Sequence, residues 1–385
     1  MATTHWLGAG LSSGPGIRRL AQSGSGHELT LWNRTLAKAE AALAGVSSSA
    51  TAKAFDWESL KSNVAAGDVI VSMLPATMHL DVAQVCLDKR AHFVSSSYVS
   101  PEMKQLDQTA TQHNLCFLNE CGLDPGLDHL MAHVLVHEYK NSDAFAADNA
   151  HSFRSYCGGF PKVPNDFKYK FSWSPLGVLR ALRSPAQWIE QGKVQQTDKP
   201  WKSLKNYPTR LPDGEETFQS YPNRDSLPFK PEYGFDDSWK MKEFVRGTLR
   251  LDGWAEAWSE IFALVDTAEG EAGQKALADK SDELWQAYQY DAGESDRVVL
   301  SVELHVEKGD ATVWHQSYCL DACGNENGSA MARLVSLPVS IAVDSVLNGS
   351  VETGVSAATK DINAVNRWFE ELKSLGEQFQ QIKIV

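Results

Sequence analysis

The sequence has few cysteines, no long apolar run and fewer basic than acidic residues. Six cysteines in 385 residues are too few for a disulfide framework. No run of about 18 apolar residues is present, which predicts no membrane-spanning helix and no membrane partner. Lysine and arginine total 36 against 49 aspartates and glutamates, a net charge of −13. Since nucleic-acid binding rests on basic contacts to phosphates, this balance predicts no nucleic-acid partner.

The cysteines do not predict a metal site either. Cys319 and Cys323 form a C-x-x-x-C pair, but no second cysteine or histidine pair stands at zinc-binding spacing. The other four cysteines stand singly and are expected to be reduced thiols. Residues 1–5 lead directly into an apolar segment and a glycine loop, without the pattern of a secretory leader. A reducing, cytoplasmic location is therefore expected.

The composition is that of a globular protein, with 43% hydrophobic and 22% charged residues, and the length allows two domains. Up to Asn119, short apolar runs alternate with helical patterns, as in parallel α/β sheets. We predict a Rossmann-type, doubly wound parallel sheet. Its expected strands are His5–Leu7, Leu29–Trp32, Ala50–Phe55, Val69–Leu74, His92–Ser95 and Leu115–Asn119. The helices expected between and after these strands include Ala37–Leu43, Met78–Asp88 and Pro101–His113.

After Tyr139 the apolar pattern alternates over longer stretches, which predicts a second α/β domain with a mostly antiparallel, mixed sheet. Its expected strands are Ser152–Tyr156, Lys168–Ser172, Phe244–Leu251, Arg297–Val306 and Ala311–Cys319, with a hairpin turn at Glu307–Asp310. Pro200–Trp239 shows little periodicity, but its frequent aromatic residues predict a long ordered excursion over a site and not a flexible linker. Ser329–Asn348 and Ile362–Leu375 are expected helices. We place the first domain at residues 1–125, completed by helices at about 345–385, and the second at 126–344.

A glycine loop follows the first expected strand and precedes a helix. It reads G-A-G-L-S-S-G from Gly8 and departs from the G-x-G-x-x-G pattern by one residue. Gly8 would permit the tight turn and Gly10 the approach of a pyrophosphate. Gly14 or Gly16 would allow close packing of the helix against a strand. In this strand–loop–helix setting the loop predicts dinucleotide binding, although a plain glycine-rich turn has the same composition.

The end of the second expected strand distinguishes NADP from NAD. NAD sites place Asp or Glu there to accept from the ribose 2′-hydroxyl, whereas this chain has Asn33-Arg34-Thr35. A guanidinium pairs with a 2′-phosphate, so NADP is favoured over NAD, and a solvated surface arginine is the alternative reading of Arg34. Leu74, which ends the fourth expected strand, is an equally good candidate for the ribose wall or for simple core packing.

The segment Asn119–Ala132 reads NECGLDPGLDHLMA and joins an expected strand to an expected helix. Asp124 followed by Pro125 is typical of an N-cap and a first helical position, so a helix is predicted to start there. Its positive end would face the carboxyl edge of the sheet, where open α/β sheets bind ligands.

Together with this segment, five further motifs resemble saccharopine dehydrogenase of the L-glutamate-forming type, over nearly the whole chain and in the expected order. These are SSSYVSPEM (Ser95–Met103), SYCGGFP (Ser155–Pro161), KFSWSPLGVLRAL (Lys170–Leu182), YPNRD (Tyr221–Asp225) and VRGTLRLDGW (Val245–Trp254). The resemblance implies a Rossmann domain and a substrate-binding and dimerisation domain. It also implies a homodimer of lysine metabolism that reversibly reduces, with NADPH, the imine of glutamate and 2-aminoadipate 6-semialdehyde to saccharopine.

The resemblance also implies site residues. Cofactor contacts would come from Gly8, Gly10, Leu11, Ser12, Ser13, Asn33, Arg34, Thr35, Phe55, Asp56, Leu74, Leu123, Pro125 and Ser174. Substrate contacts would come from Ser97, Tyr98, Asp124, Arg224, Gly247, Thr248 and Leu249.

The chemistry of saccharopine, with three carboxylates, an ammonium and a secondary amine, is consistent with these residue types. Arg224 can bind a carboxylate through two hydrogen bonds, and Asp124 can bind an ammonium. Tyr98, Asp124 and Cys157 are the candidates for proton transfer. Cys157 is as well explained as a packed thiol, and Gly247 as a β-bulge. We hypothesise that Asp124 orients the amine while water carries the protons.

Two other functions stay open at the level of sequence. One is a related imine reductase, such as a carboxynorspermidine dehydrogenase, which the Arg224 and Gly247–Leu249 matches disfavour. The other is an NADP-binding protein without turnover, which the polar residues of the motifs disfavour.

Overall fold

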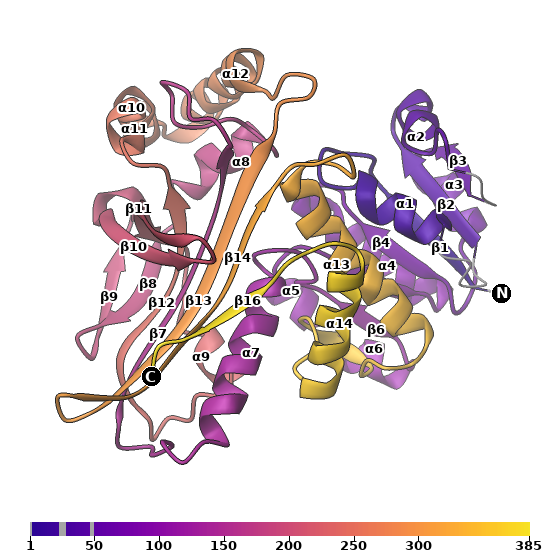
Figure 1. The fold of residues 1–385 in the computed structure, drawn as a ribbon. Coiled ribbons are helices and arrows are strands. Elements are labelled where there is room, and N and C mark those ends of the chain that lie inside the picture. The colour runs from indigo at the N-terminus through magenta and orange to yellow at the C-terminus, as the bar shows by residue number, and fades with distance from the viewer. Residues whose placement is uncertain (1, 23–27, 47–49) are drawn as a thin grey trace. The chain divides into compact units, whose positions relative to one another are not determined.

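The computed structural model describes residues 2–22, 28–46 and 50–385, which form two compact units (Figure 1). Unit 1 comprises Met1–Leu130 and Glu326–Gly376, and unit 2 comprises Met131–Asn325 and Glu377–Val385. The chain thus changes unit after residues 130, 325 and 376, whereas the boundaries predicted from the sequence are 125/126 and about 345.

Unit 1 contains a seven-stranded parallel sheet, which confirms the Rossmann-type prediction. Its order is β15-β6-β5-β4-β1-β2-β3, so the chain winds outward in both directions from β1 and β4. The strands are β1 (Thr3–Leu7), β2 (Glu28–Asn33), β3 (Thr51–Ala54), β4 (Val69–Ser72), β5 (His92–Ser95), β6 (Cys116–Leu118) and β15 (Gly354–Ser356). Six match predicted strands. The sequence analysis missed β15, which pairs with β6.

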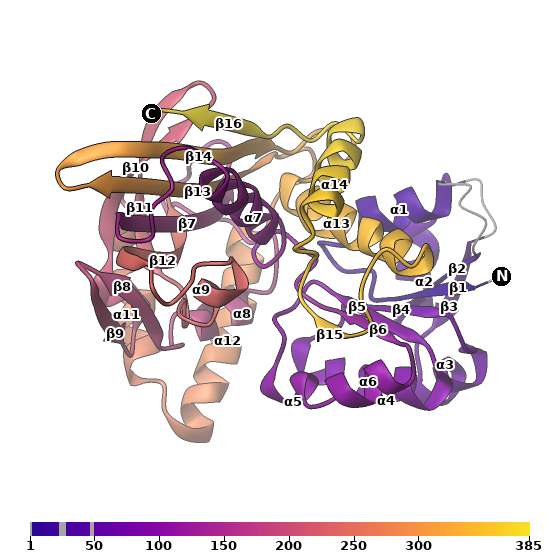
Figure 2. The same ribbon diagram turned by 90° about the horizontal axis from the view of Figure 1, so that it is seen from below.

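Helices cover both faces of this sheet (Figure 2). One face carries α3 (Trp57–Asn63), α4 (His79–Lys89), α5 (Pro101–Lys104) and α6 (Asp107–Gln112). The other carries α1 (Gly14–Gln22), α13 (Ala330–Leu347) and α14 (Ile362–Ser374), and α2 (Leu36–Ala42) follows β2. The predicted helix Pro101–His113 is interrupted between α5 and α6 at Gln105 and Leu106.

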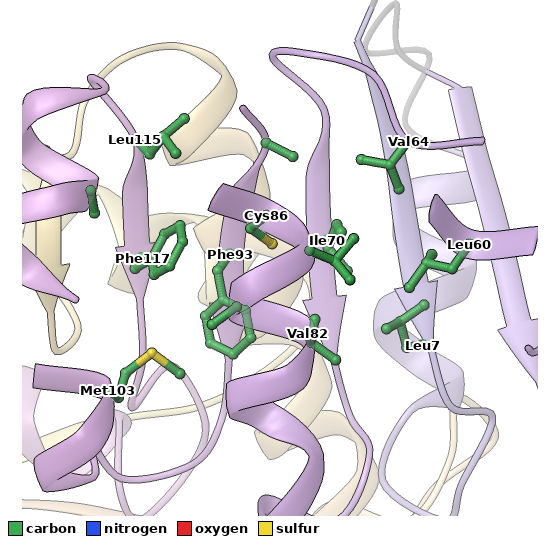
Figure 3. Packing of buried hydrophobic residues seen from close by; sticks show 14 of the residues in the cluster. Leu7, Leu60, Val64, Ile70, Val82, Cys86, Phe93, Met103, Leu115 and Phe117 are labelled. Atoms are coloured by element: carbon green, nitrogen blue, oxygen red, sulfur yellow. The ribbon is translucent and has the colours of Figure 1, made fainter. Parts of the chain in front are cut away.

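Apolar side chains from strands and helices fill the first of these two interfaces (Figure 3). Ile70, Phe93 and Phe117 are successive cross-strand neighbours on one face of β4, β5 and β6. They pack with helix residues such as Val82 and Met103, all at 2% exposure or less. Burying each such side chain contributes about 1.5–3 kcal/mol, so this layer holds the strand ends in place.

α13 is the most apolar helix of unit 1. By length and composition it would pass as a membrane span, with a mean hydropathy of 1.6 over 18 residues, but 78% of it is buried inside the structure. It lies against α1, α14, β4 and β5. A buried core helix accounts for this composition.

Unit 2 is built on a mixed sheet whose main path is β10-β11-β12-β7-β13-β14-β16. Its strands are β7 (Ala150–Pro161), β8 (Ala186–Glu190), β9 (Lys193–Thr197), β10 (Lys205–Leu211), β11 (Gly214–Pro222), β12 (Lys240–Arg250), β13 (Asp296–Lys308), β14 (Ala311–Cys323) and β16 (Gln380–Lys383). Of its described strand pairs, β7 with β12 is parallel and the others are antiparallel, as predicted. β13 and β14 form the predicted hairpin, with Lys308 opposite Ala311.

The helices of unit 2 include α7 (Leu127–Lys140), whose first residues belong to unit 1, and α9 (Phe229–Glu232). A group of helices packs at one end of the sheet (Figure 1) and consists of α8 (Pro175–Ala181), α10 (Trp254–Ala257), α11 (Ser259–Thr267) and α12 (Gly270–Tyr288). Their buried aromatic cluster includes Trp254 and Trp258, both at 0% exposure.

One predicted strand of unit 2 is wrong. Lys168–Ser172 is not a strand, because Tyr169 and Phe171 insert their rings into the aromatic helix cluster and only Phe171 forms a bridge, with Gln289. The Pro200–Trp239 excursion contains the β10–β11 hairpin, which was not predicted. Leu211 and Phe218 of the hairpin are buried in a hydrophobic cluster with other residues of the sheet. Apolar and polar residues alternate only briefly in this segment, so the two strands were not predicted.

Candidate active site

The glycine loop leaves β1 at the carboxyl edge of the unit 1 sheet. Gly8 has φ +103°, and a Cβ there would lie 2.9 Å from the Met73 carbonyl oxygen, so this position requires glycine. A Cβ at Gly10 would have nothing within 4 Å, and Gly10 is exposed. Leu11 is 54% exposed, Ser12 half-buried and Ser13 buried. The loop therefore leaves open space above Gly10, next to the N-terminus of α1, where a pyrophosphate fits.

The structure assigns the packing role to Gly16. A Cβ at Gly16 would lie 2.2 Å from the Ser336 carbonyl oxygen, whereas one at Gly14 would meet only the flexible side chain of Arg18, at 3.3 Å. Gly16 N also donates to Ser336 Oγ at 2.9 Å. The close contact is thus between α1 and α13, and not with a strand as the sequence pattern suggested.

The end of β2 presents the predicted 2′-phosphate residues. Asn33 Oδ1 accepts from Ala9 N at 3.2 Å, and its Nδ2 donates to the Thr35 carbonyl at 2.9 Å. Asn33 therefore ties the glycine loop to this strand end. Arg34 and Thr35 are exposed beside it. The residues present, a guanidinium and a hydroxyl with no carboxylate in the Asn33–Thr35 segment, fit a phosphorylated ribose.

Three further predicted cofactor residues follow β3 and β4. Asp56 caps α3 by accepting from Ser59 N at 2.8 Å, and this hydrogen bonding lowers the pKa of the Asp56 carboxyl. The half-buried Phe55 packs edge-on against Trp57, with 5.2 Å between ring centroids. Leu74 Cδ2 lies 3.7 Å from the position of a Cβ on Gly8. Leu74 thus lies beside the glycine loop, as a ribose wall would.

Tyr98 and Asp124 come together beyond the ends of β5 and β6. The Tyr98 hydroxyl donates to Asp124 Oδ1 at 3.3 Å, and both residues are half-buried. Ser97 precedes Tyr98 in the same loop, and its carbonyl accepts from Glu120 N at 3.0 Å. The unit 1 members of the predicted substrate set therefore form one cluster.

Asp124 is not the N-cap that the sequence predicted. The α7 helix begins at Leu127, whose N donates to the Gly122 carbonyl at 2.9 Å. Gly122 N also donates to the Pro125 carbonyl, which closes a tight turn through a glycine at φ +146°, Gly126. These bonds occupy the backbone groups that a helix starting at Pro125 would use. Leu123 and Pro125 are buried, and Asp124 is left to contact Tyr98.

The Glu120 side chain links the loop after β5 to the start of α7. Its Oε1 accepts from Val99 N at 2.9 Å, and its Oε2 lies 2.7 Å from His129 Nε2. Asp128 Oδ2 lies 3.4 Å from His129 Nδ1, while Asp128 Oδ1 accepts from Gly126 N at 2.7 Å. All three side chains are buried. His129 and Asp128 were not among the predicted site residues, although both stand inside the quoted motif Asn119–Ala132.

In unit 2, Cys157 and Thr248 are cross-strand neighbours on β7 and β12. Since side chains alternate along a strand, Arg246 and Arg250 share the face of Thr248, while Gly247 and Leu249 face the other way. A Cβ at Gly247 would lie 2.3 Å from the Tyr156 ring, so this glycine allows close packing. The irregularity of β12 lies elsewhere, between Met241 and Glu243, so Gly247 is not a bulge.

Arg224 and Ser174 lie in loops of unit 2. Arg224 is exposed with φ +56°, and its carbonyl accepts from Gln187 N at 2.9 Å. Pro222, two residues earlier, pairs with Gly247, so the Arg224 loop starts beside β12. Ser174 caps α8 by accepting from Gly177 N at 3.2 Å.

Arg250 was not among the predicted site residues, although it is a nearly buried cation, at 7% exposure. Its Nη2 donates to the Tyr221 hydroxyl at 2.8 Å, and its guanidinium lies 5.0 Å and 5.2 Å from the ring centroids of Tyr169 and Trp254. No carboxylate of the described residues pairs with it. The spacing of Arg246, Thr248 and Arg250, every second residue of a strand, is the signal that could have found it.

Residues 2–22, 28–46 and 50–385 contain no group of three or more His, Cys, Asp and Glu side chains that could hold a metal ion.

The chain resembles known proteins over most of its length. A family model described as the saccharopine dehydrogenase NADP binding domain matches residues 4–118, and one described as the saccharopine dehydrogenase C-terminal domain matches residues 122–377. The L-glutamate-forming, NADP(+) saccharopine dehydrogenase of Pyricularia oryzae is 31% identical, over 91% of this chain and 92% of that protein. The Saccharomyces cerevisiae enzyme of the same description is 30% identical, over 90% and 91%.

A solved structure, apo saccharopine dehydrogenase (L-Glu forming) from Saccharomyces cerevisiae, superposes with a TM-score of 0.80 at 26% identity. The match covers 100% of both chains.

Proposed function

The chain belongs to the saccharopine dehydrogenase family, and from this premise we propose that it is an NADP-dependent, L-glutamate-forming saccharopine dehydrogenase. In the forward direction glutamate and 2-aminoadipate 6-semialdehyde condense with loss of water, and the resulting imine is reduced to the secondary amine of saccharopine. The single observation that carries this proposal is the similarity to two enzymes of that description over at least 90% of the chain.

The residues of unit 1 would bind and orient the reactants. NADPH, when bound, supplies the hydride that reduces the imine carbon. The open loop at Gly10–Ser13 would hold its pyrophosphate and Arg34 its 2′-phosphate.

The Asp124 carboxylate, held by the Tyr98 hydroxyl at 3.3 Å, would accept from the substrate amine. A carboxylate has two oxygens, so one can face Tyr98 while the other faces the substrate. Asp124 would thus fix the position of the nitrogen, and water would carry the protons.

The predicted substrate residues of unit 2 suit the recognition of carboxylates. Arg224 is exposed and can form two parallel bonds to a carboxylate, and Thr248 offers a hydroxyl on the face shared with Cys157. An amino-acid substrate with several carboxylates suits these donors. Cys157 is buried, at 9% exposure, which favours the packing role over proton transfer.

The experiment that tests the function is oxidation of saccharopine with NADP, followed by identification of the released amino acid. Release of glutamate with formation of NADPH supports the proposal. Release of lysine, or no NADPH from any saccharopine concentration, overturns it.

We also propose a cytoplasmic homodimer. The six cysteines all lie in the described part of the chain and form no disulfide, which suits a reducing compartment. The dimer rests on the family resemblance, in which the second domain mediates dimerisation. Light scattering of the purified protein at several concentrations would test it, with a mass near 42.4 kDa contradicting it and twice that mass supporting it.

A further inference from the structure

His79, the first residue of α4, bridges two serines that belong to different strand ends. Its Nδ1 lies 2.8 Å from Oγ of Ser72, the last residue of β4, and its Nε2 lies 2.8 Å from Oγ of Ser97, in the loop after β5. The ring is 6% exposed and packs edge-on against Phe93, with 6.1 Å between centroids. Both nitrogens are thus engaged and the ring orientation is fixed.

A neutral imidazole has one donor nitrogen and one acceptor nitrogen. Burial lowers the pKa of His79 to about 4, so the ring is neutral at physiological pH. Two arrangements then satisfy both serines. In the first, Ser72 Oγ donates to Nδ1, and Nε2–H donates to Ser97 Oγ. In the second, Ser97 Oγ donates to Nε2, and Nδ1–H donates to Ser72 Oγ.

The two arrangements present different groups to a ligand at Ser97. In the first, the Ser97 hydroxyl hydrogen is directed away from His79 and is available to a ligand. In the second, that hydrogen points at His79 and Ser97 offers only lone pairs. The backbone of Ser97 is fixed separately, because its N donates to Ser95 Oγ at 3.3 Å and its carbonyl accepts from Glu120 N at 3.0 Å. Rotation of the hydroxyl is therefore what His79 controls.

One residue of this bridge, His79, lines a cavity, next to the loop that carries Ser97. His79 lines a pocket of about 310 Å³ together with Tyr98 and Asn119, all from unit 1. Tyr98 follows Ser97 and contacts Asp124. The Ser72–His79–Ser97 bridge thus reaches from the sheet to the loop that carries the predicted substrate residues.

We propose that His79 is a positioning residue whose Nε2–H holds Ser97 Oγ, so that the Ser97 hydroxyl donates to a substrate carboxylate. Saccharopine carries three carboxylates, which accept hydrogen bonds, and this selects the first arrangement. The inference rests on the proposed function for the identity of the carboxylate. The direction of the hydrogen bonds in the protein itself can be measured without any substrate.

The first test is the tautomer of His79, read from the 15N shifts of the imidazole in the wild-type protein. His79→Gln identifies the resonance by its loss. Protonation at Nε2, unchanged from about pH 6 to 9, supports the proposal. Protonation at Nδ1, or titration of the ring near the ordinary histidine pKa of about 6.5, overturns it. This outcome does not depend on whether saccharopine is the substrate.

The second test compares His79→Leu with His79→Gln in the oxidation of saccharopine. Leucine removes both bonds and is expected to raise KM for saccharopine about tenfold, whereas the KM for NADP changes little. The glutamine amide can place an N–H near the position of Nε2, so His79→Gln is expected to recover most of the loss. The pH profile of kcat/KM should keep its apparent pKa values in both variants, since a positioning residue does not exchange protons with substrate.

Two comparisons separate positioning from general damage. In a Ser97→Ala background, His79→Leu should add less than about twofold to KM, because its target hydroxyl is gone. His5→Leu is a matched control, since His5 is also buried, at 2% exposure, and bonds Asp68 and Trp32 on the same sheet. It is expected to lower stability without changing KM.

The outcomes distinguish the inference from the function it rests on. If the wild type oxidises saccharopine and His79→Leu keeps its KM, or if the effects of His79→Leu and Ser97→Ala are additive, the inference is wrong and the function stands. If the wild type does not turn over saccharopine, the function is wrong, and the tautomer measurement still decides the orientation of Ser97.

Discussion

Glu120 Oε2 lies 2.7 Å from His129 Nε2, and both side chains are buried, at 5% and 2% exposure. The other oxygen of Glu120 accepts from Val99 N, in the loop that carries Ser97 and Tyr98. One carboxylate therefore joins this loop to the start of α7. The positions of Tyr98 and Asp124 depend on that link.

Replacing Glu120 by alanine should destabilise the protein by about 2–4 kcal/mol, because the part-buried Val99 N and the buried His129 Nε2 lose the carboxylate that they contact. Denaturant unfolding measures this loss, and KM for saccharopine should rise with it. Glu58→Ala is the control, since the Glu58 side chain is 89% exposed and its removal should leave stability unchanged. Equal stability of the two variants would contradict the bracing role.

Arg34→Asp should lower the preference for NADPH over NADH by at least about tenfold, because a carboxylate repels the 2′-phosphate that a guanidinium attracts. The ratio of kcat/KM for the two cofactors measures the change. Lys38→Asp, at an exposed position of α2, makes the same change of charge one turn away and should have a smaller effect. An equal loss of NADPH preference in the two variants would mean that Arg34 acts only through its positive charge at long range, and not through contact with the 2′-phosphate.

Substitution of Gly16, in the first turn of α1, should lower stability, whereas substitution of Gly10, in the cofactor loop, should weaken NADP binding. Gly16→Ala places a methyl group 2.2 Å from the Ser336 carbonyl and should cost about 1–3 kcal/mol, because α1 and α13 must move apart. Gly10→Ala meets nothing within 4 Å in the protein, so it should keep stability and weaken NADP binding by filling the pyrophosphate space. Thermal unfolding and NADPH fluorescence titration measure the two effects, and unchanged NADP affinity of Gly10→Ala would refute this cradle.

The strands of unit 1 could be predicted because buried parallel strands such as Val69–Ser72 read as short apolar runs between helical patterns. β15 could not, because three residues carry no periodicity and its partner β6 is remote in sequence. The helix start at Asp124 was mispredicted because the turn bonds of Gly122 depend on φ +146° at Gly126, which the dipeptide Asp-Pro does not reveal.

The residues of the candidate site also divide into those that could be predicted from the sequence and those that could not. Residues in contiguous motifs, such as Tyr98 and Asp124, could be singled out from the sequence and lie together in unit 1. His79 could not, because Ser72 and Ser97 meet it only after two strands are placed side by side. Contacts made by tertiary packing, and not by sequence spacing, account for the residues that were missed.

Glu303 on β13 should make stability depend on acid pH. Although burial raises its pKa, hydrogen bonds from His315 and Tyr207 and the charge of Arg154 lower it from 4.5 to about 2. A carboxyl with a depressed folded pKa contributes stability above its unfolded pKa and loses it as pH falls through the folded value. The free energy of unfolding should therefore drop between about pH 5 and 2 by roughly 3 kcal/mol more in the wild type than in Glu303→Gln.

Urea titrations at several pH values measure this difference. Glu256→Gln, at an exposed position of α10, should keep the wild-type pH dependence. If the free energy of unfolding of Glu303→Gln depends on pH as that of the wild type does, the Glu303 carboxyl does not account for the acid sensitivity.

Tyr98 and Asp124 should act as one unit in catalysis, since the Tyr98 hydroxyl donates to Asp124 Oδ1 at 3.3 Å. Asp124→Asn removes the charge that would hold the substrate amine and should lower kcat/KM by about tenfold or more. Tyr98→Phe should lower it less, because the carboxylate stays but is less well oriented.

The double variant should be little worse than Asp124→Asn alone, because the tyrosine then has no carboxylate to position. Tyr290→Phe is a control that removes a buried hydroxyl without a hydrogen-bond partner among the described residues, and it should keep full activity. Steady-state kinetics of saccharopine oxidation decide the matter: additive losses would show that Tyr98 contacts the substrate independently of Asp124, and an unchanged kcat in Asp124→Asn with a slightly raised KM would remove Asp124 from the mechanism.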